Sequence, residues 1–447
     1  MTCPPLSAEI DLAVKVKPPR GEVRQAAHAG VLLVSAGGVT GVLNLLFNVV
    51  VARRGGAANF GAISSLFTLV TAVGIVATGF QYGIARQAAV SSRVARELVR
   101  PAISSVLPGA GGALLLSALS WPLSVFLRLP SQAPIYFIVA VAVVSVFAAA
   151  VSGLLIGFQR FRVIAALGVG AALLRLGLGF LVGRGPTAVT ISLAVSLIGL
   201  VASFVAGLLF LTVGAHAARP RIALPKASDS EGGTGSAGLL GAVIAGTLWT
   251  AWGLPVLFAR HILHPSAAGD FAATQLLAGA LIWGTAPIVT AFFPTIARLR
   301  TRRAFVYGEL ATLALALIGA ALLTAVGPVV VQHLYGSSFL ASRQVLAVLT
   351  ISATATACVT FAAWAAMAGK AHVGHVLIAL LTALGTELAW DLLSAHTPTT
   401  LAAAPAISLL IGSATFFAVT RRCAVAATVA LPTEAAALSQ SALRGEP

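Results

Sequence analysis

The stretch VGAALLRLGLGFLVG, residues 169–183, carries a single charge, Arg175, in an otherwise apolar run. A guanidinium offers a planar fork of donors that matches phosphate oxygens in pairs, so Arg175 is suited to an acidic ligand group such as a phosphate or an acidic sugar. A charge in lipid costs about 2.5–3.5 kcal/mol, so Arg175 must face protein or water. Its spacing from Arg162 predicts a position near mid-membrane. The structural alternatives are a bond to a carbonyl and a buried ion pair with Glu387.

Two amides, Asn44 and Asn48, lie one turn apart on the face that leads up to Arg53. Amides in lipid need partners, so they either bind ligand hydroxyls or join a neighbouring helix. Further arginines and glutamines are expected to line the outer exit, and interface anchoring is the alternative for the arginines. The candidate substrate-binding residues are Arg175, Asn44, Asn48, Arg53, Arg54, Gln81, Arg260 and Gln275.

A pair of like charges, Glu387 and Asp391, lies at i, i+4 near the end of a late apolar run. Proximity and partial burial would raise the pKa of one carboxyl, which makes the pair the ion-coupling candidate. The alternative is a solvated rim, and we expect Asp391 to lie there. Glu387, one turn deeper, is the better proton site.

Three tryptophans, Trp249, Trp252 and Trp283, fall in the second half of the chain. Their rings are able to stack on sugar faces, while interfacial anchoring and packing are the common alternatives.

The sequence offers little for catalysis or for a cofactor. It has no Gly-rich loop with Lys and Ser/Thr for ATP, and no loop large enough to carry an acid, a base and a nucleophile. His261 and His264 have HxxH spacing, but two ligands do not make a zinc site. We therefore expect no metal, no cofactor and no enzyme activity.

The composition identifies the solvent in which these residues lie. Hydrophobic residues make up 58% of the 447, charged residues only 9%, and the mean hydropathy is +0.99. A chain so poor in charge is built for lipid, and its long apolar runs predict an all-α polytopic membrane protein of about twelve helices. The runs lie near 31–51, 61–80, 102–127, 134–157, 163–182, 188–212, 237–259, 271–293, 309–331, 345–367, 373–390 and 400–419.

Lys and Arg indicate the orientation, because the cytoplasmic side of a membrane retains them. Most of the 28 such residues fall in the two tails and in alternate connections. We expect a multi-pass protein of the plasma (cytoplasmic) membrane with both termini cytoplasmic. This topology also explains the formal charge of +16, so no nucleic-acid partner is expected.

The two halves of the chain begin alike. The first reads ARRGGAANFG from Ala52 and ends its second run at Ala85–Arg86; the second reads ARHILHPSAAGDF from Ala259 and ends at Ala297–Arg298. Copies six helices apart share an orientation, which predicts a parallel repeat of two six-helix lobes around a central cavity. The expected divisions are a cytoplasmic N-terminal tail at 1–30, an N-lobe at 31–213, a cytoplasmic linker at 214–236, a C-lobe at 237–420 and a cytoplasmic C-terminal tail at 421–447.

These motifs resemble the polysaccharide flippases of the multidrug/oligosaccharidyl-lipid/polysaccharide exporter superfamily, whose first outer loop commonly reads A-R-x-L-G-P-E-x-Y/F-G. Here Gly55 replaces the leucine and Ala57–Ala58 replace Pro-Glu. The runs GDFAATQLLAGALIWGTAPIVTAFFPTIARL and HLYGSSFLASRQVLAVL resemble the family's eighth span and the loop that enters its tenth. The likeness extends from about Val31 to Arg422.

The resemblance implies alternating access and movement of a lipid-linked oligosaccharide to the outer leaflet during cell-surface polysaccharide biosynthesis. The implied partners are the bilayer, an isoprenoid-pyrophosphate-linked glycan and a glycan polymerase or glycosyltransferases. An ion-coupled drug or metabolite antiporter of the same superfamily and a non-transporting scaffold for glycan assembly stay open. An antiporter for organic cations would be expected to carry carboxylates at mid-depth, where this sequence has an arginine.

Overall fold

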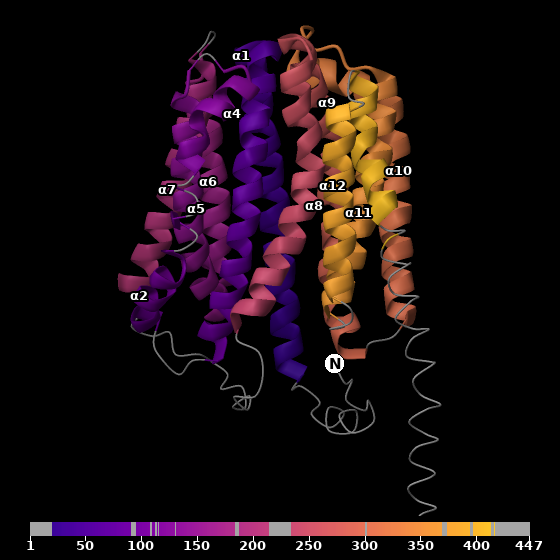
Figure 1. The fold of residues 1–447 in the computed structure, drawn as a ribbon. Helices are drawn as coiled ribbons and strands as arrows, with labels where there is room; N and C mark the ends of the chain where they lie inside the picture. Colours follow the sequence, from indigo (N-terminus) through magenta and orange to yellow (C-terminus); the bar gives the residue numbers. More distant parts are fainter. Residues whose placement is uncertain are drawn as a thin grey trace, which may run out of the picture.

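The computed structural model describes residues 20–90, 95–107, 110–111, 114, 116–129, 131–183, 187–213, 234–299, 302–368, 373–393, 397–412 and 415. Within these ranges the regular structure is helical throughout, and helices that start far apart in the sequence run roughly parallel to one another (Figure 1). The predicted all-α polytopic fold is confirmed.

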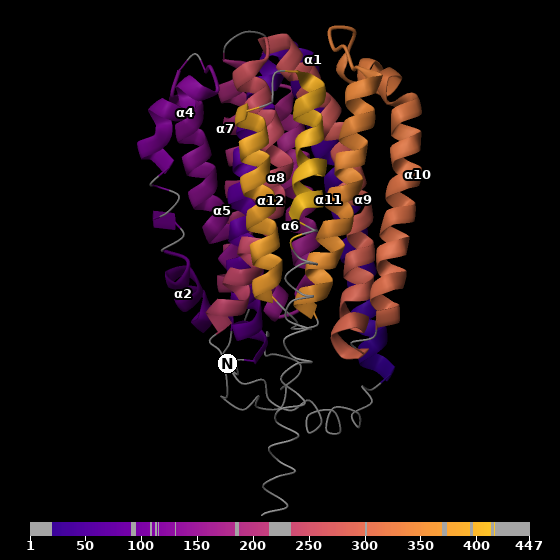
Figure 2. The ribbon, with the colours of Figure 1, turned by 45° about the vertical axis from the view of Figure 1, so that its right-hand side comes forward.

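The helices form an N-terminal and a C-terminal group that lie side by side (Figures 1 and 2). The N-terminal group comprises α1 (Arg20–Val90), α2 (Ala95–Ser105), a short 3₁₀ helix (Leu116–Leu119), α4 (Ser120–Phe126), α5 (Ala133–Gly157), α6 (Phe161–Gly179) and α7 (Ala188–Val213). The C-terminal group comprises α8 (Thr234–Ile262), α9 (Pro265–Leu299), α10 (Arg302–Tyr335), α11 (Arg343–Ala368), α12 (Val373–Leu393) and a final helix, Pro398–Gly412.

Two predicted spans make up α1, which folds back on itself at Gly56. The backbone there has φ 76°, a left-handed value that glycine adopts without strain. The rings of Phe47 and Phe67 lie 6.0 Å apart, although twenty residues of straight helix would separate them by about 30 Å. Residues 20–55 are the first arm of α1 and residues 57–90 are the second arm.

A single helix over the predicted span 102–127 is wrong. The described part of this region contains the end of α2, the 3₁₀ helix and α4 instead. Pro122 lies in the first turn of α4, where its missing N–H is tolerated, and α4 begins there after the 3₁₀ helix.

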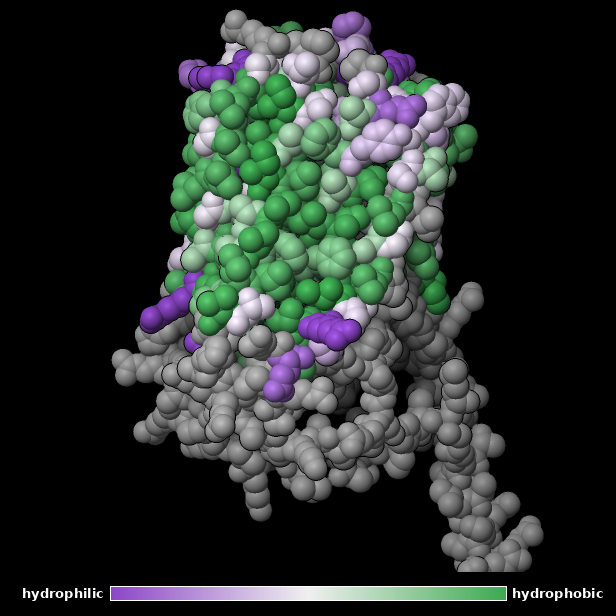
Figure 3. All heavy atoms as spheres, turned by 90° about the vertical axis from the view of Figure 1, so that its left-hand side faces the viewer, coloured by the Kyte–Doolittle hydropathy of each residue, from purple (hydrophilic) through white to green (hydrophobic). Residues whose placement is uncertain are grey.

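Apolar residues cover most of the face seen in Figure 3, with hydrophilic residues near its upper and lower edges. Six helical segments in the described residues are long and apolar enough to cross a membrane: Ser35–Ala72, Ala133–Gly157, Phe161–Gly179, Ala188–Val213, Phe305–Tyr335 and Arg343–Ala363.

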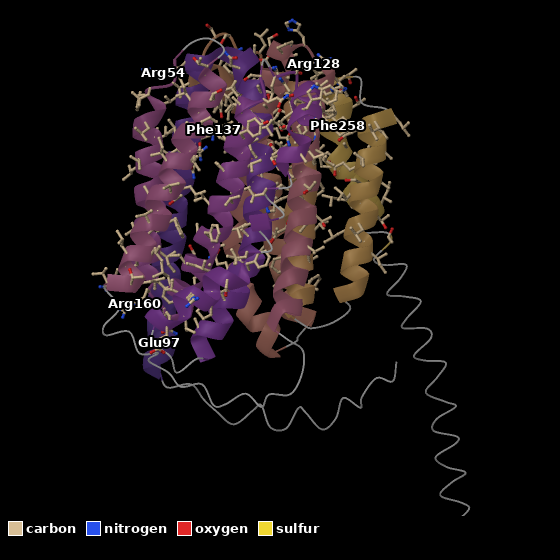
Figure 4. All side chains as sticks on the ribbon, turned by 60° about the vertical axis from the view of Figure 1, so that its left-hand side comes forward. Arg54, Glu97, Arg128, Phe137, Arg160 and Phe258 are labelled. Atoms are coloured by element: carbon tan, nitrogen blue, oxygen red, sulfur yellow. The ribbon has the colours of Figure 1, made fainter. Side chains whose placement is uncertain are left out.

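The two ends of the molecule carry different residues. Arg54 and Arg128 lie at the end where α1 reverses, called the Gly56 end, and Glu97 and Arg160 lie at the other, the Arg160 end (Figure 4). One hydrophobic core contains buried residues of both helix groups, such as Phe60 and Phe339, which contact each other. A second core, around Val106 and Leu154, belongs to the N-terminal group alone.

Candidate functional site

The two helix groups touch through glycines at the Gly56 end. The backbones of α1 and α9 approach so closely that a Cβ on Gly269 would overlap the carbonyl oxygen of Ala57. A Cβ on Gly61 would lie 2.9 Å from the Gly269 backbone nitrogen. One turn further along α1, Ser65 donates a hydrogen bond to the carbonyl of Val256 on α8 at 3.3 Å. Because small residues allow this close helix packing, the Gly56 end is shut.

Arg260 strengthens the closure from α8. Its buried guanidinium donates to three backbone carbonyls, those of Leu127, Ala58 and Arg128, at 3.1–3.3 Å. Arg128 donates in turn to the carbonyl of Leu263 at 3.4 Å. Burial, and then the charge of Arg128, lower the pKa of Arg260. Arg260 therefore joins the two helix groups.

Arg53 reaches from α1 to the last turn of α10. It donates to the carbonyls of Leu334, at 2.6 Å, and His333. These oxygens lie at the negative end of the helix dipole, which favours a cation. Arg53 is thus a second link between the helix groups.

Within the C-terminal group, Asp270 on α9 accepts a hydrogen bond from the Leu340 backbone N–H at 3.0 Å, and burial raises the pKa of the Asp270 carboxyl.

Away from the Gly56 end, the α9 surface that faces α1 becomes exposed. Gly269 marks the stripe of α9 that faces α1, and Ala272, Leu276, Ala280 and Trp283 continue it at helical spacing. Ala272 is only 2% exposed, Leu276 is half-buried, and Trp283 is 59% exposed. Exposure along this stripe rises toward the Arg160 end, and we interpret the exposed stretch as an opening between the groups.

Arg175 lies within the N-terminal group, between α6 and both arms of α1. Its Nη1 donates to Asn44 Oδ1 at 3.1 Å, which brings together two residues of the predicted site. The guanidinium carbon lies 4.1 Å from the Phe47 ring centroid and 4.7 Å from that of Phe67. Its Nε is buried without a hydrogen-bond partner. The cation is therefore held by one amide and two ring faces, and no carboxylate among the described residues pairs with it.

Arg175 lies closer to one end of α6 than its spacing from Arg162 predicts. It is four residues from Gly179, where α6 ends, and this is about 6 Å along the helix. Phe180 follows Gly179, and its carbonyl accepts a hydrogen bond from Arg54 at the Gly56 end. α6 ends at Gly179, three residues before the end of the predicted run, so Arg175 lies near the closed end rather than midway along the helix.

Sequence reasoning did not identify Phe47 and Phe67 as partners of Arg175. Phe47 shares a helix face with Asn44 at i, i+3, so its position could have been found from that spacing. Phe67 comes from the second arm of α1, and no local pattern relates it to Arg175.

The remaining predicted site residues are spread over the molecule. Asn48 donates to the backbone carbonyl of Asn44 at 2.9 Å, within one helix. The guanidinium of Arg54 lies 5.6 Å from the Phe180 ring centroid. Gln275 is buried and donates to the carbonyl of Trp252, across to α8. Gln81 does not join the exit residues, because it lies 25 residues beyond Gly56, toward the Arg160 end.

Two tryptophans pack together on the C-terminal side of the opening. The ring centroids of Trp249 on α8 and Trp283 on α9 are 4.5 Å apart, with the planes inclined by 31°. Trp252 behaves differently: it is 8% exposed, and its ring packs beside Gly279.

The predicted carboxylate pair is buried between α12 and the final helix. Glu387 is 0% exposed and accepts a hydrogen bond from the Ser408 hydroxyl at 3.1 Å. Its other oxygen and both oxygens of Asp391 have no hydrogen-bond partner among the described residues. The two groups are thus poised to hold a proton or a cation, because a buried charge needs compensation.

Asp391 is 1% exposed, so its expected place on a solvated rim is wrong. The final helix covers this part of α12, where Trp390 donates through Nε1 to the carbonyl of Thr400 at 3.1 Å. The sequence of α12 alone does not predict that the final helix packs over Asp391.

Among the described residues, no group of three His, Cys, Asp or Glu side chains is placed to hold a metal ion. The two HxxH histidines have separate partners: His261 stacks on Phe126 with ring centroids 4.4 Å apart, and His264 Nδ1 lies 3.0 Å from the Ser266 hydroxyl.

Comparison with known proteins adds a family and a fold. A family described as polysaccharide biosynthesis protein matches residues 27–300, and no curated protein matches the chain. The solved lipid II flippase MurJ, in an inward closed conformation, is similar with a TM-score of 0.62 at 15% identity over 87% of each chain.

Two further solved structures share the fold. An inward-facing multidrug resistance MATE transporter of the MOP superfamily gives a TM-score of 0.61 at 14% identity, covering 88% of this chain and 99% of its own. A MOP superfamily transporter from Pyrococcus furiosus, described as having a binding pocket of reverse polarity, gives 0.55 at 12% identity over 89% and 94%. At these identities the likeness shows the fold alone.

Proposed function

Because the chain belongs to the polysaccharide biosynthesis protein family, we propose that it is a transporter that flips a lipid-linked oligosaccharide from the cytoplasmic to the outer leaflet. The observation that carries the substrate class is Arg175, a half-buried cation whose described neighbours include no carboxylate. Such a cation is suited to the pyrophosphate that joins an isoprenoid to a glycan.

The arrangement of the helix groups suits alternating access. The Gly56 end is shut by the Gly61–Gly269 contact and by Arg53 and Arg260, while the interface is exposed further toward the Arg160 end. The distribution of Lys and Arg supports a cytoplasmic Arg160 end, with both termini on that side of the plasma membrane. In this state the protein is ready to accept a cytoplasmic substrate.

In this proposal the N-lobe is residues 31–213 and the C-lobe residues 237–420, joined by the linker 214–236. The lobes rock about the opening, and the arginines of the Gly56 end part to release the glycan. Arg53, Arg54, Arg260 and Gln275 then line the exit as their present hydrogen bonds break. A glycan polymerase or glycosyltransferases would act on either side of this step.

Glu387 and Asp391 are the proposed ion-coupling site. They lie in the C-lobe, and their unpaired oxygens are buried, so binding of a proton or cation would stabilise this packing. The same pair favours a second candidate, an ion-coupled antiporter for a drug or metabolite.

The sidedness of the lipid-linked glycan in membranes tests the proposal. We expect a deletion strain to hold this glycan on the cytoplasmic leaflet, wild type to restore outer-leaflet glycan, and Arg175→Ala at matched protein level to fail. Arg343→Ala is the matched control, because Arg343 is an exposed arginine at the start of α11. Outer-leaflet glycan that is unchanged in the deletion strain would exclude the flippase and favour the antiporter or a scaffold.

A further inference from the structure

Trp283 occupies a position that neither packing nor anchoring explains. Its ring is 59% exposed, so it does not serve mainly to fill a core. It lies 18 residues from Pro265 and 16 from Leu299, the two ends of α9, which is about 24 Å or more from either end. An interfacial anchor would lie near a helix end.

The direction of Trp283 indicates what its exposed face meets. It continues the α9 stripe that contacts α1 at Gly269, and this helical spacing points its ring toward the opening between the lobes. Trp249 supports the ring from α8 at 4.5 Å, and Trp249 itself packs against the core shared by both lobes. The second ring fixes the orientation of the first.

We propose that Trp283, backed by Trp249, is a stacking platform for a sugar ring of the transported glycan. This inference rests on the proposed flippase function and adds to it a site for the glycan itself. The C–H face of a pyranose is apolar and slightly positive, and it packs on the negative face of an indole. A rigid pair of tryptophans offers this face with little loss of conformational entropy on binding.

The platform lies at a different depth from Arg175. Trp283 is 14 residues beyond Gly269, about 21 Å from the contact between α9 and α1, whereas Arg175 is about 6 Å from the end of α6 that Arg54 joins to α1. Phosphate and sugar are thus bound at separate levels, and this separation selects an oligosaccharide over a bare isoprenyl pyrophosphate.

Binding to the purified full-length protein in nanodiscs tests the platform. The two probes are farnesyl pyrophosphate, which has no sugar, and the lipid-linked oligosaccharide fraction extracted from the source cells. We expect Trp283→Leu to weaken binding of the extract about tenfold, the scale of one lost aromatic stack, and to leave farnesyl pyrophosphate binding unchanged. Trp283→Phe should retain most of the affinity, and Arg175→Ala should weaken both probes.

The control is Trp121→Leu, which removes another exposed tryptophan, 66% exposed on α4. Unchanged extract binding by Trp283→Leu, or an equal loss in Trp121→Leu, would overturn the platform while leaving the flippase function intact. Failure of wild type to bind either probe would overturn the proposed function together with the platform.

Discussion

At the residue scale, Arg175 has two properties that a single substitution separates. Arg175→Lys keeps the positive charge but loses the planar fork and the stacking on Phe47 and Phe67. We expect flipping to fall about tenfold, as for the loss of one charged hydrogen bond, while the protein level stays near wild type. The measurement is outer-leaflet glycan at matched expression. Wild-type activity in Arg175→Lys would show that charge alone suffices.

The sequence predicts the polar residues of the site better than their surroundings. A charge or an amide in an apolar run is visible by itself, and this pattern identified Arg175, Asn44 and Glu387. The cover over Asp391 comes from the next helix, and the ring of Phe67 comes from the second arm of α1. Contacts of this kind depend on how helices pack, which local patterns do not encode.

At the scale of elements, the contact between α1 and α9 depends on the lack of a side chain. Gly269→Ala would drive a Cβ into the Ala57 carbonyl, and we expect it to destabilise the closed Gly56 end by about 1–3 kcal/mol. The melting temperature of purified protein should fall. Gly284→Ala is the control on the same helix, because a Cβ there meets nothing within 4 Å. Equal melting temperatures for the two variants would contradict the close contact.

Arg53 holds the same end through the terminal carbonyls of α10. In Arg53→Ala we expect the Gly56 end to open more often, because those carbonyls lose their cation. Ser65, fully buried between the lobes, reports the opening when replaced by cysteine in a background without the native cysteines. A membrane-impermeant thiol reagent added outside should label it faster in Arg53→Ala. An unchanged labelling rate would show that Arg53 does not help to keep the Gly56 end shut.

The elements themselves were largely predictable from apolar runs. The runs correspond to α5, α6, α7 and the later helices, and the loop at Ala52–Gly61 corresponds to the reversal at Gly56. The prediction for segment 102–127 failed in part because hydropathy does not register Pro122, which lies in the first turn of a new helix, α4.

At the scale of the whole molecule, the resemblance found in ARRGGAANFG is confirmed by the family match and by the shared fold. The internal repeat and the loop motif that carry this resemblance can be recognised in the sequence alone. The conformational state was not predictable, because shut and open states contain the same helices and differ in the contacts between lobes.

The coupling of transport to an ion gradient is also a property of the whole molecule. Glu387→Gln keeps an oxygen that accepts from Ser408 but removes the ionisable group. We expect transport in Glu387→Gln vesicles to lose its dependence on an imposed proton or cation gradient. Glu97→Gln, at an exposed glutamate on α2, is the matched control. A gradient dependence equal to that of wild type would exclude Glu387 from coupling.

Reconstitution tests the central claim most directly. Purified protein is inserted into vesicles that carry the extracted lipid-linked oligosaccharide in one leaflet, and the glycan that reaches the other leaflet is measured over time. We expect movement with wild type, none in protein-free vesicles, and a rate near that background with Arg175→Ala. Equal rates for Arg175→Ala and wild type would contradict the role of the arginine, and the absence of movement with wild type would contradict the flippase itself.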